Sequence, residues 1–264
     1  MPEYDHIEYA VADATATVSL DRPESLNALH ADLLAELEAA LGRAESTDGV
    51  RAVVLRGNGR AFSAGYDIGE GEADLGTVEE RIRDRYTHLD TIFELTLPVI
   101  AAVDGHALAG GCNLALACDL TLATERSEFG YPDMHFGELP AKFVLPFVGG
   151  SLKHARELLY TGKTVPAREA ARMGFVNRVV ADDALDDAVA AEVDHMRKTP
   201  GPLVTMLKEM VNEVQETQGD RRGRIDEFLA TLTMQSEAPA TFRRIRDEEG
   251  LDAALEWMHE TDKD

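Results

Sequence analysis

The sequence predicts a protein of the α/β class, and three observations support this prediction. Short β-type runs alternate with segments of helical pattern through the first part of the 264-residue chain. A unit of strand, turn and helix start recurs along that part, and the last third has a helical pattern throughout. A chain of this length can bury a sizeable core, so it suits one large domain with an appendage or two small domains.

The N-terminal segment predicts a β-hairpin followed by a helix. Its strands run from Ile7 to Val11 and from Ala14 to Leu20, around Ala12-Asp13. Arg22-Pro23 ends this sheet, and Asn27 is expected to cap the next helix. That helix is predicted from about Ala28 to Arg43, because five leucines recur in it at helical spacing: Leu29, Leu33, Leu34, Leu37 and Leu41.

The next segment predicts a strand, a turn, a loop and a helix. The strand runs from Val50 to Arg56, and Gly57-Asn58-Gly59 is a turn signal. The stretch from Ala61 to Ile68 is interpreted as a loop. A polar amphipathic helix from Val78 to Leu95 is expected to stop before Pro98.

The chain is organised around the stretch from Val103 to Asp119. A strand from Val99 to Val103 precedes it, and a strand from Leu120 to Ala123 follows. Gly110 and Gly111 allow close backbone approach, and good helix formers come after them, so a helix should start here. Such a helix start presents free backbone N–H groups at the positive end of the helix dipole, which suits an oxygen atom that becomes negative.

The remainder of the chain predicts a series of helices. The best linker candidate within it is Thr199-Pro200-Gly201-Pro202, which divides the chain into residues 1–199 and 200–264. The predicted helices are Ser151 to Tyr160, Pro166 to Met173, Asp183 to Lys198, Leu203 to Glu216, Ile225 to Gln235 and Leu251 to His259.

The charge balance excludes two classes of partner. The formal net charge is −23, from 49 acidic and 26 basic residues, and only six of the basic residues are lysine. This excess repels nucleic acid and anionic membranes, so neither is expected to bind. An acidic, lysine-poor surface is also typical of a protein from a halophile, whose salty cytoplasm screens the self-repulsion.

A cytoplasmic location is expected. The acidic start of the chain has no apolar core of a signal peptide, and no run approaches a membrane span. Cys112 and Cys118 are too far apart for a CxxC pair, and no further cysteine completes a metal set. They are therefore interpreted as reduced, packed thiols, and no metal site is predicted.

Four segments stand in a specific order and spacing: Asp21 to Leu29 (DRPESLNAL), Ala61 to Ile68 (AFSAGYDI), Gly105 to Asp119, and Phe129 to Pro140. Together they resemble the crotonase superfamily, the enoyl-CoA hydratase/isomerase enzymes. The resemblance implies a crotonase-like spiral of ββα repeats over residues 1–199. It implies a helical trimerisation region over residues 200–264, and hence a homotrimer or a hexamer built as a dimer of trimers. The substrate would be an acyl-CoA thioester, with coenzyme A as part of the substrate and no permanently bound cofactor.

The resemblance also implies which residues bind the substrate. Two backbone N–H groups of the family bind the thioester carbonyl, and they are matched here to Ala64 and Gly110. Ala64, Gly65, Tyr66 and Asp67 match the loop that lines coenzyme A, although Asp67 is also a good helix N-cap. A second CoA-contacting segment is matched by Ser25 and Leu26.

The catalytic positions depart from the family pattern. Hydratases with two carboxylates place one Glu after Gly-Gly-Cys and another after Gln-Pro, where this sequence has Asn113 and Asp133. An amide cannot exchange protons at neutral pH, so Asn113 can only orient water or substrate. Asp133 is left as the proton carrier, with a surface acid as the alternative interpretation. His135 is a weaker acid–base candidate. Lys142 is interpreted as a solvated lysine at a helix start, with contact to a substrate carboxylate or phosphate as the alternative.

Three interpretations of function stay open. An enoyl-CoA hydratase ranks slightly ahead, because the family contains many. A double-bond isomerase is the alternative, because a 1,3-proton shift needs only one base such as Asp133. A non-catalytic crotonase-like binding or assembly subunit is the alternative of another class, since one glutamate is missing. Fold resemblance does not settle the reaction.

Overall fold

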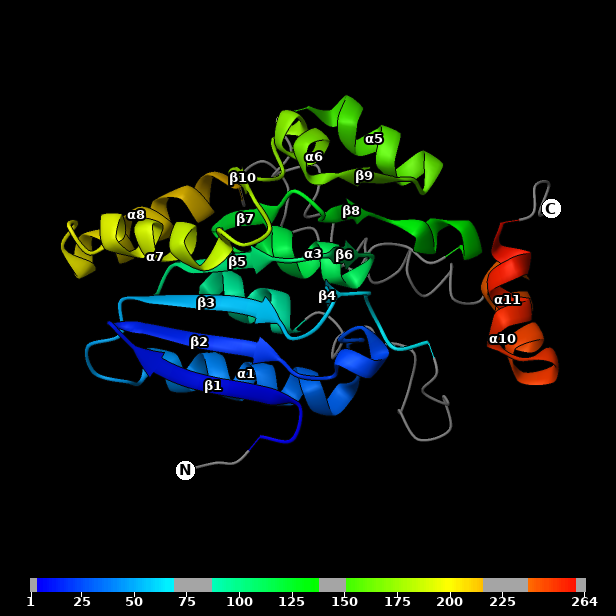
Figure 1. Ribbon diagram of the computed structural model, residues 1–264, viewed down its shortest axis with the longest axis horizontal. Helices are drawn as coiled ribbons and strands as arrows, with labels where there is room; N and C mark the ends of the chain where they lie inside the picture. The colour runs from blue at the N-terminus through cyan, green and yellow to red at the C-terminus, as the bar shows by residue number, and fades with distance from the viewer. Residues whose placement is uncertain (1–3, 69–86, 138–150, 216–236, 260–264) are drawn as a thin grey trace.

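Two β-sheets organise the fold (Figure 1), in a computed structural model that describes residues 4–68, 87–137, 151–215 and 237–259. Within these residues the larger sheet has the strand order β1-β2-β3-β5-β7-β10, and the smaller has the order β4-β6-β8-β9. The strands of the larger sheet are β1 (Ile7–Ala12), β2 (Thr15–Leu20), β3 (Ala52–Gly57), β5 (Val99–Val103), β7 (Leu120–Thr124) and β10 (Arg178–Val180). Those of the smaller sheet are β4 (Ala61–Ser63), β6 (His106–Leu108), β8 (Glu128–Gly130) and β9 (Thr164–Pro166).

The chain passes repeatedly from the larger sheet to the smaller one. It does so from β3 to β4, from β5 to β6 and from β7 to β8, and each strand pairs in parallel with its counterpart in the next repeat. The antiparallel pairs are β1 with β2 and β8 with β9. The α/β class and the crotonase-like spiral are therefore confirmed.

The predicted strands are confirmed within one or two residues, and five strands were missed, namely β4, β6, β8, β9 and β10. The N-terminal hairpin turns at Asp13 and Ala14, which both have positive φ. The segment interpreted as a loop from residue 61 begins with β4, and neither β9 nor β10 was predicted. Each missed strand has three residues, which is too short for a period-two pattern to be recognised.

The predicted helix cap at Asn27 is wrong. Helix α1 spans Ala31–Glu45, and its N-cap is His30, whose Nδ1 accepts from the Leu33 N–H at 3.4 Å. Asn27 instead has a left-handed conformation with φ 54°. Its buried side chain donates to the carbonyls of Asn58 and Ala61 at 2.9 and 2.8 Å. Asn27 thus links the turn before α1 to the entry of β4, rather than starting the helix.

The helices largely follow the predicted pattern. Those with described bounds are η1 (Pro23–Ser25), α3 (Gly110–Ala117), η3 (Pro132–Phe136), α5 (Leu152–Thr161), α6 (Ala167–Met173), α7 (Leu185–Met196), α8 (Gly201–Gln215), α10 (Glu237–Glu249) and α11 (Leu251–Met258). Helix α10 was not predicted. The expected linker is partly wrong, because α8 already begins at Gly201. The helix expected over residues 78–95 is described from residue 87, and the one expected over 225–235 lies outside the described residues.

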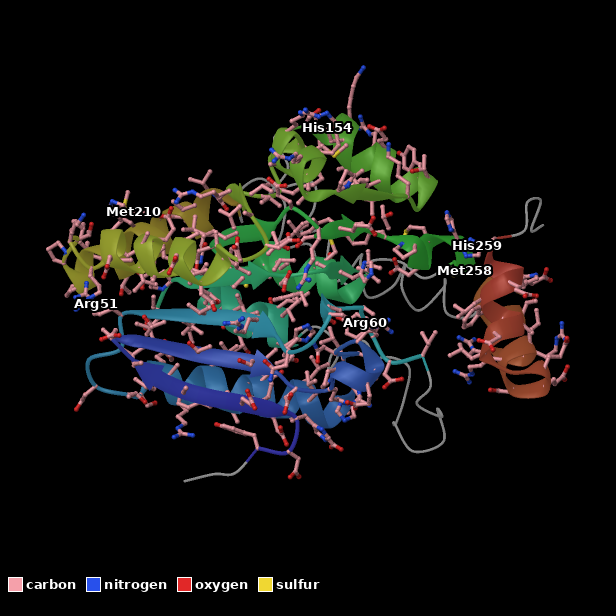
Figure 2. The ribbon with its side chains drawn as sticks, viewed as in Figure 1. Arg51, Arg60, His154, Met210, Met258 and His259 are labelled. Carbon is pink, nitrogen blue, oxygen red and sulfur yellow. The ribbon has the colours of Figure 1, made fainter. Side chains whose placement is uncertain are left out.

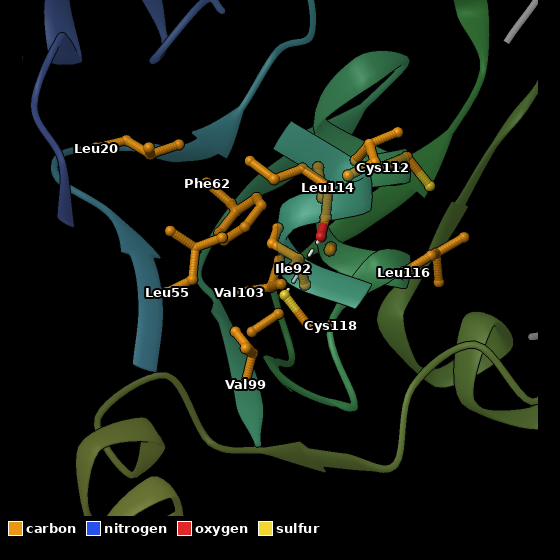
Figure 3. Packing of buried hydrophobic residues seen from close by; sticks show 14 of the residues in the cluster. Leu20, Leu55, Phe62, Ile92, Val99, Val103, Cys112, Leu114, Leu116 and Cys118 are labelled. Atoms are coloured by element: carbon orange, nitrogen blue, oxygen red, sulfur yellow. Dashed lines mark hydrogen bonds between the residues drawn. The ribbon is translucent and has the colours of Figure 1, made fainter. Parts of the chain in front are cut away.

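The main core surrounds α3 and the inner face of the larger sheet (Figure 3). Leu55, Phe62, Ile92 and Leu114 are fully buried there. Both cysteines belong to this cluster and both are free thiols. Burial raises the pKa of the Cys112 thiol to about 12, so it stays protonated and unreactive. The expectation of packed, reduced thiols is confirmed.

The helices after residue 184 cover two distant parts of the molecule. Helix α7 packs against the larger sheet through Leu185, Val189 and Val193. Arg51, at the left of Figure 2, donates to the Thr199 carbonyl at 2.7 Å just before α8. Helices α10 and α11 form a small cluster of their own at the opposite end of Figure 1.

Candidate active site

Two chain segments meet closely at the start of α3. Gly65 has φ +100°, and a Cβ there would lie 2.8 Å from the Ala109 Cβ and 3.0 Å from the Gly110 nitrogen. A Cβ on Gly110 would lie 2.7 Å from the Tyr66 ring. These approaches require glycine at both positions. The loop after β4 is therefore pressed against the first N–H groups of α3.

Ala109 gives this helix start an unusual geometry. It is the N-cap of α3, with φ 51° and ψ −121°, a combination that is strained for a residue with a side chain. Its N–H donates to the Gly130 carbonyl at 2.8 Å, which ties the turn to β8. Gly110 follows as the first helical residue. Its N–H is thus one of the end groups that the helix itself does not use.

The structure contradicts the oxyanion role predicted for Ala64. The Ala64 N–H donates to the Leu26 carbonyl at 3.0 Å, so it is already used within the protein. The Gly65 N–H donates to Ser63 Oγ at 3.2 Å, and the Asp67 N–H to the Leu29 carbonyl at 3.0 Å.

The two segments expected to contact coenzyme A lie side by side. Besides the bond between Ala64 and Leu26, the Leu29 N–H donates to the Gly65 carbonyl at 2.8 Å. Ser25 is the last residue of η1, directly before Leu26. Arg22 joins the segments through an ion pair with Asp67 at 3.0 Å. A capping role for Asp67 would involve a helix after residue 68, outside the described residues.

Asn113 and Asp133 are both buried, and Tyr131 connects their surroundings. Asp133 on η3 is only 8% exposed, so the interpretation as a surface acid is wrong. The Tyr131 hydroxyl donates to Asn113 Oδ1 at 2.7 Å. Burial, with Cys112 and Asp133 nearby, raises the pKa of Tyr131 well above its usual value. The structure therefore gathers an amide, a phenol and a carboxyl group at this end of α3.

Two histidines lie near these groups in the chain or in space. The Nε2 of the partly buried His135 contacts the Thr161 carbonyl at 2.8 Å, and its ring lies 6.3 Å from the His259 ring. His88 was missed by the sequence reasoning, although it is fully buried and its ring packs 6.2 Å from the Tyr66 ring. The helical pattern around His88 is polar, so no signal in it indicated burial. Lys142 lies outside the described residues.

One group of described residues has the geometry to hold a metal ion. The ligand atoms of His6, His30 and Asp32 lie within 4.8 Å of one another. However, a metal on Nε2 of His30 would leave the imidazole proton on Nδ1. A protonated Nδ1 cannot accept the hydrogen bond that the Leu33 N–H now donates to it. Metal binding would thus remove the cap of α1. We assign no metal to this group.

The sequence pattern of one family matches almost the whole chain. A model of the enoyl-CoA hydratase/isomerase family matches residues 11–256. The chain belongs to the enoyl-CoA hydratase/isomerase family. A probable enoyl-CoA hydratase of Rhizobium meliloti is 36% identical over 237 residues, which cover 85% of this chain and 90% of the relative.

Two further proteins are similar to this chain, one in sequence and one in both sequence and structure. A 4-chlorobenzoyl coenzyme A dehalogenase-2 of Arthrobacter is 34% identical, with 79% of this chain and 78% of the relative covered. The crystal structure of an enoyl-CoA hydratase/isomerase from Xanthobacter autotrophicus Py2 has a TM-score of 0.89 and 36% identity, covering 97% of this chain and 98% of that one. Among the described residues, no helix has the length and apolar character needed to cross a membrane.

Proposed function

We propose that this protein is an acyl-CoA enzyme, an enoyl-CoA hydratase that adds water syn across the double bond of a 2-enoyl-CoA. Family membership and the similarity to the probable hydratase of Rhizobium meliloti support this. The observation that carries it is a buried carboxyl group, Asp133, whose charge acts on Cys112 in the first turn of the helix that begins at Gly110. Coenzyme A enters as part of the substrate, and no permanently bound cofactor is required.

The thioester oxygen would be bound by two backbone N–H groups. Gly110 supplies one, as the sequence predicts. We move the second from Ala64 to Tyr66, because the Ala64 N–H is used within the protein and Tyr66 lies against Gly110. Two such donors stabilise the developing negative charge by roughly 3–8 kcal/mol. Ser25, Leu26, Gly65, Tyr66 and Asp67 are proposed to line coenzyme A.

Hydration then requires one proton carrier. Asp133 takes a proton from water while the hydroxyl adds to C3, and the electron pair of the double bond moves to the thioester oxygen as an enolate. Asp133 returns the proton to C2, which restores the carbonyl and completes the addition of one water molecule. Asn113 holds no exchangeable proton at neutral pH, so it orients the water.

A double-bond isomerase is the second candidate, and one observation favours it. Of the two family positions that carry glutamate in two-carboxylate hydratases, only the one at Asp133 carries an acid here. One carboxylate suffices to move a proton from one carbon to another through the same enolate. The active-site groups described above serve this reaction equally well.

Incubation of the purified protein with panels of 2-enoyl- and 3-enoyl-CoA, followed by mass spectrometry, separates these functions. A mass gain of one water from a 2-enoyl-CoA supports the hydratase. An isobaric product from a 3-enoyl-CoA supports the isomerase and contradicts the hydratase. Retention on a CoA column without turnover of any substrate contradicts both and supports a non-catalytic binding subunit.

Replacing Asp133 by Asn tests the proton carrier. The change keeps the size of the side chain but removes the carboxylate, so kcat should fall by about 100- to 10,000-fold. CoA affinity, measured by calorimetry, should change little, because the thioester is held by backbone groups. Asn113→Ala should cost less, because an amide only orients. Full activity of Asp133→Asn together with loss of activity in Asn113→Ala would reverse these assignments.

The assembly that we propose is a homotrimer, or a hexamer made of two trimers, through residues 200–264. Helix α8 supports this with an exposed apolar stripe at helical spacing, and Met210 of this stripe is labelled in Figure 2. The stripe consists of Leu203, Met206, Leu207, Met210, Val211 and Val214. The apolar residues Leu229, Leu232 and Met234, also expected to contribute, lie outside the described residues. A cytoplasmic location, without nucleic-acid or membrane partners, is proposed from the acidic charge.

A further inference from the structure

The Asn113 side chain is held in one orientation. The Tyr131 hydroxyl donates to its Oδ1 at 2.7 Å, and Tyr131 and Asn113 are 0% and 1% exposed. Burial raises the pKa of Tyr131 well above its usual value, so the phenol keeps its proton at neutral pH. Tyr131 is therefore a permanent donor here. A donor of this kind fixes the oxygen, and not the nitrogen, of the amide as its acceptor.

The other end of the amide is left for a ligand. Asn113 Nδ2 is buried, and no residue that the structure describes accepts a hydrogen bond from it. A buried amide donor without an acceptor is unfavourable, so such a group in a folded protein calls for an explanation. A bound acceptor, present only with the substrate, supplies one.

The position of Asn113 places this donor near the proposed oxyanion donor and the proposed proton carrier. Its N–H donates to the Ala109 carbonyl at 3.1 Å, which places Asn113 one turn along α3 from Gly110 and on the same face. Asp133 lies two residues after Tyr131, and its charge acts on both Tyr131 and Cys112. The amide donor, the Gly110 N–H and the Asp133 carboxyl thus belong to one site.

We propose that Tyr131 is a positioning residue, which turns the Asn113 amide so that Nδ2 donates to the oxygen atom at C3 of the acyl group. That oxygen is the attacking water in hydration and the hydroxyl of a 3-hydroxyacyl-CoA in the reverse direction. This inference rests on the proposed function, and it narrows the substrates to acyl groups that carry or receive an oxygen at C3. A donor to the water oxygen cannot remove its proton, which leaves that task to Asp133.

Tyr131→Phe removes the hydroxyl alone and lets the amide rotate. Hydration kcat should fall by about 3- to 10-fold, the effect of one neutral hydrogen bond, while KM changes little. Tyr9→Phe is the control for removal of a buried hydroxyl, because the Tyr9 hydroxyl is also buried but lies on β1 and, unlike that of Tyr131, has no partner among the described residues. An unchanged kcat in Tyr131→Phe would overturn the proposal.

A double-mutant cycle separates positioning from a purely structural role. If Tyr131 acts through the amide, Tyr131→Phe should lower kcat no further in an Asn113→Ala background. An equal loss in both backgrounds would contradict the proposal. The Asn113→Asp variant tests the donor through the pH dependence of activity, with Tyr131 unchanged. The new carboxyl group can donate only when it is protonated, so the activity of this variant relative to the original protein should rise as pH falls. A ratio that is flat with pH would argue against a donor.

A binding experiment distinguishes failure of this inference from failure of the proposed function. By calorimetry, 3-hydroxybutyryl-CoA should bind about 3- to 10-fold more tightly than butyryl-CoA, because only the former has an acceptor at C3. Asn113→Ala should abolish this preference, and Tyr131→Phe should weaken it. Equal affinities in the original protein would overturn the inference. A preference without turnover of any enoyl-CoA would support it while contradicting only the hydratase function.

Discussion

Ala109 shows how one strained residue sets the geometry of the site. Its φ of 51° and ψ of −121° fall where glycine is favoured, yet its Cβ packs against Gly65. Strain of this kind costs about 1–3 kcal/mol and persists only where the surroundings enforce it. Here the bond from its N–H to the Gly130 carbonyl holds the turn in place.

Ala109→Gly should therefore stabilise the protein or leave its stability unchanged. Glycine relieves about 1–3 kcal/mol of backbone strain in the folded state. It also gives the unfolded chain more conformational entropy, which favours unfolding by only roughly 0.4–1 kcal/mol. Urea unfolding measures the difference. Ala107→Gly is the control, because Ala107 is buried in β6 with ordinary backbone angles, and it should lose stability. A similar loss in both variants would show that Ala109 is not strained.

Single residues mark where sequence reasoning succeeded and where it stopped. The roles of Gly110 and Asp133 were implied by resemblance to a family, and the structure shows that Gly110 begins α3 and that Asp133 is buried. The role of Ala64 failed because its N–H meets a carbonyl 38 positions earlier, at Leu26, a long-range contact that no local pattern encodes. No sequence pattern gave Tyr131 a role of its own. Its hydroxyl became informative once Asn113 was found beside it.

Among the elements, helix α8 is attached to the core in part through one buried charge. Lys208 Nζ donates to Asp119 Oδ2 at 2.9 Å and to the carbonyls of Ile92 and Leu97 at 3.0 and 3.1 Å. Asp119 Oδ2 also accepts from the Val99 N–H at 2.7 Å, at the start of β5. One lysine thus joins α8 to the strand that leads into the active-site turn.

Lys208→Met should destabilise the protein by about 2–4 kcal/mol, because it leaves Asp119 and two carbonyls without their cation. The midpoint of urea unfolding at constant protein concentration measures this loss. Lys198→Met, on an exposed lysine, should have no measurable effect. If both variants unfold at the same urea concentration, the buried ion pair does not hold α8.

Elements were predicted in proportion to their length. Helix α1 and strand β5 are long enough to be recognised, whereas the missed strands β4, β6, β8, β9 and β10 have three residues each. Those short strands exist because neighbouring repeats pair with them, as β4 does with β6. The spiral arrangement was implied by resemblance to a family, since local propensity does not specify which strands pair.

At the scale of the whole molecule, the exposed stripe of α8 predicts association. Met210→Asp combined with Val211→Asp should convert a trimer or hexamer into single chains, because charges at the centre of an apolar interface are left without partners. Sedimentation velocity measures the mass. Glu213→Gln is the control on the same helix and should leave assembly intact. A single-chain mass for the unaltered protein would contradict the proposed assembly.

The net charge of −23 lowers the stability of the folded state through repulsion spread over the whole surface. The described ion pairs are mostly exposed, as Arg172–Glu169 and Arg244–Glu248 are, and pairs of this kind each contribute about 0–1 kcal/mol. They offset little of the repulsion among the remaining acids. Dilute salt therefore leaves the folded state under strong self-repulsion, which expansion on unfolding relieves.

Molar salt should consequently stabilise this protein. The screening length falls from about 10 Å at 0.1 M to about 3 Å at 1 M, so repulsion between separated carboxylates is largely removed. We expect the thermal unfolding midpoint to rise steadily between 0.1 and 2 M KCl, at one protein concentration so that assembly does not vary. MgCl2 at matched ionic strength should raise the unfolding midpoint at least as much. Sucrose at the same osmolality is the control for solute exclusion, because it is excluded from the protein surface but does not screen charge. A midpoint that does not rise with KCl would contradict adaptation to a salt-rich cytoplasm, because the repulsion that salt relieves would then have no measurable effect on folding.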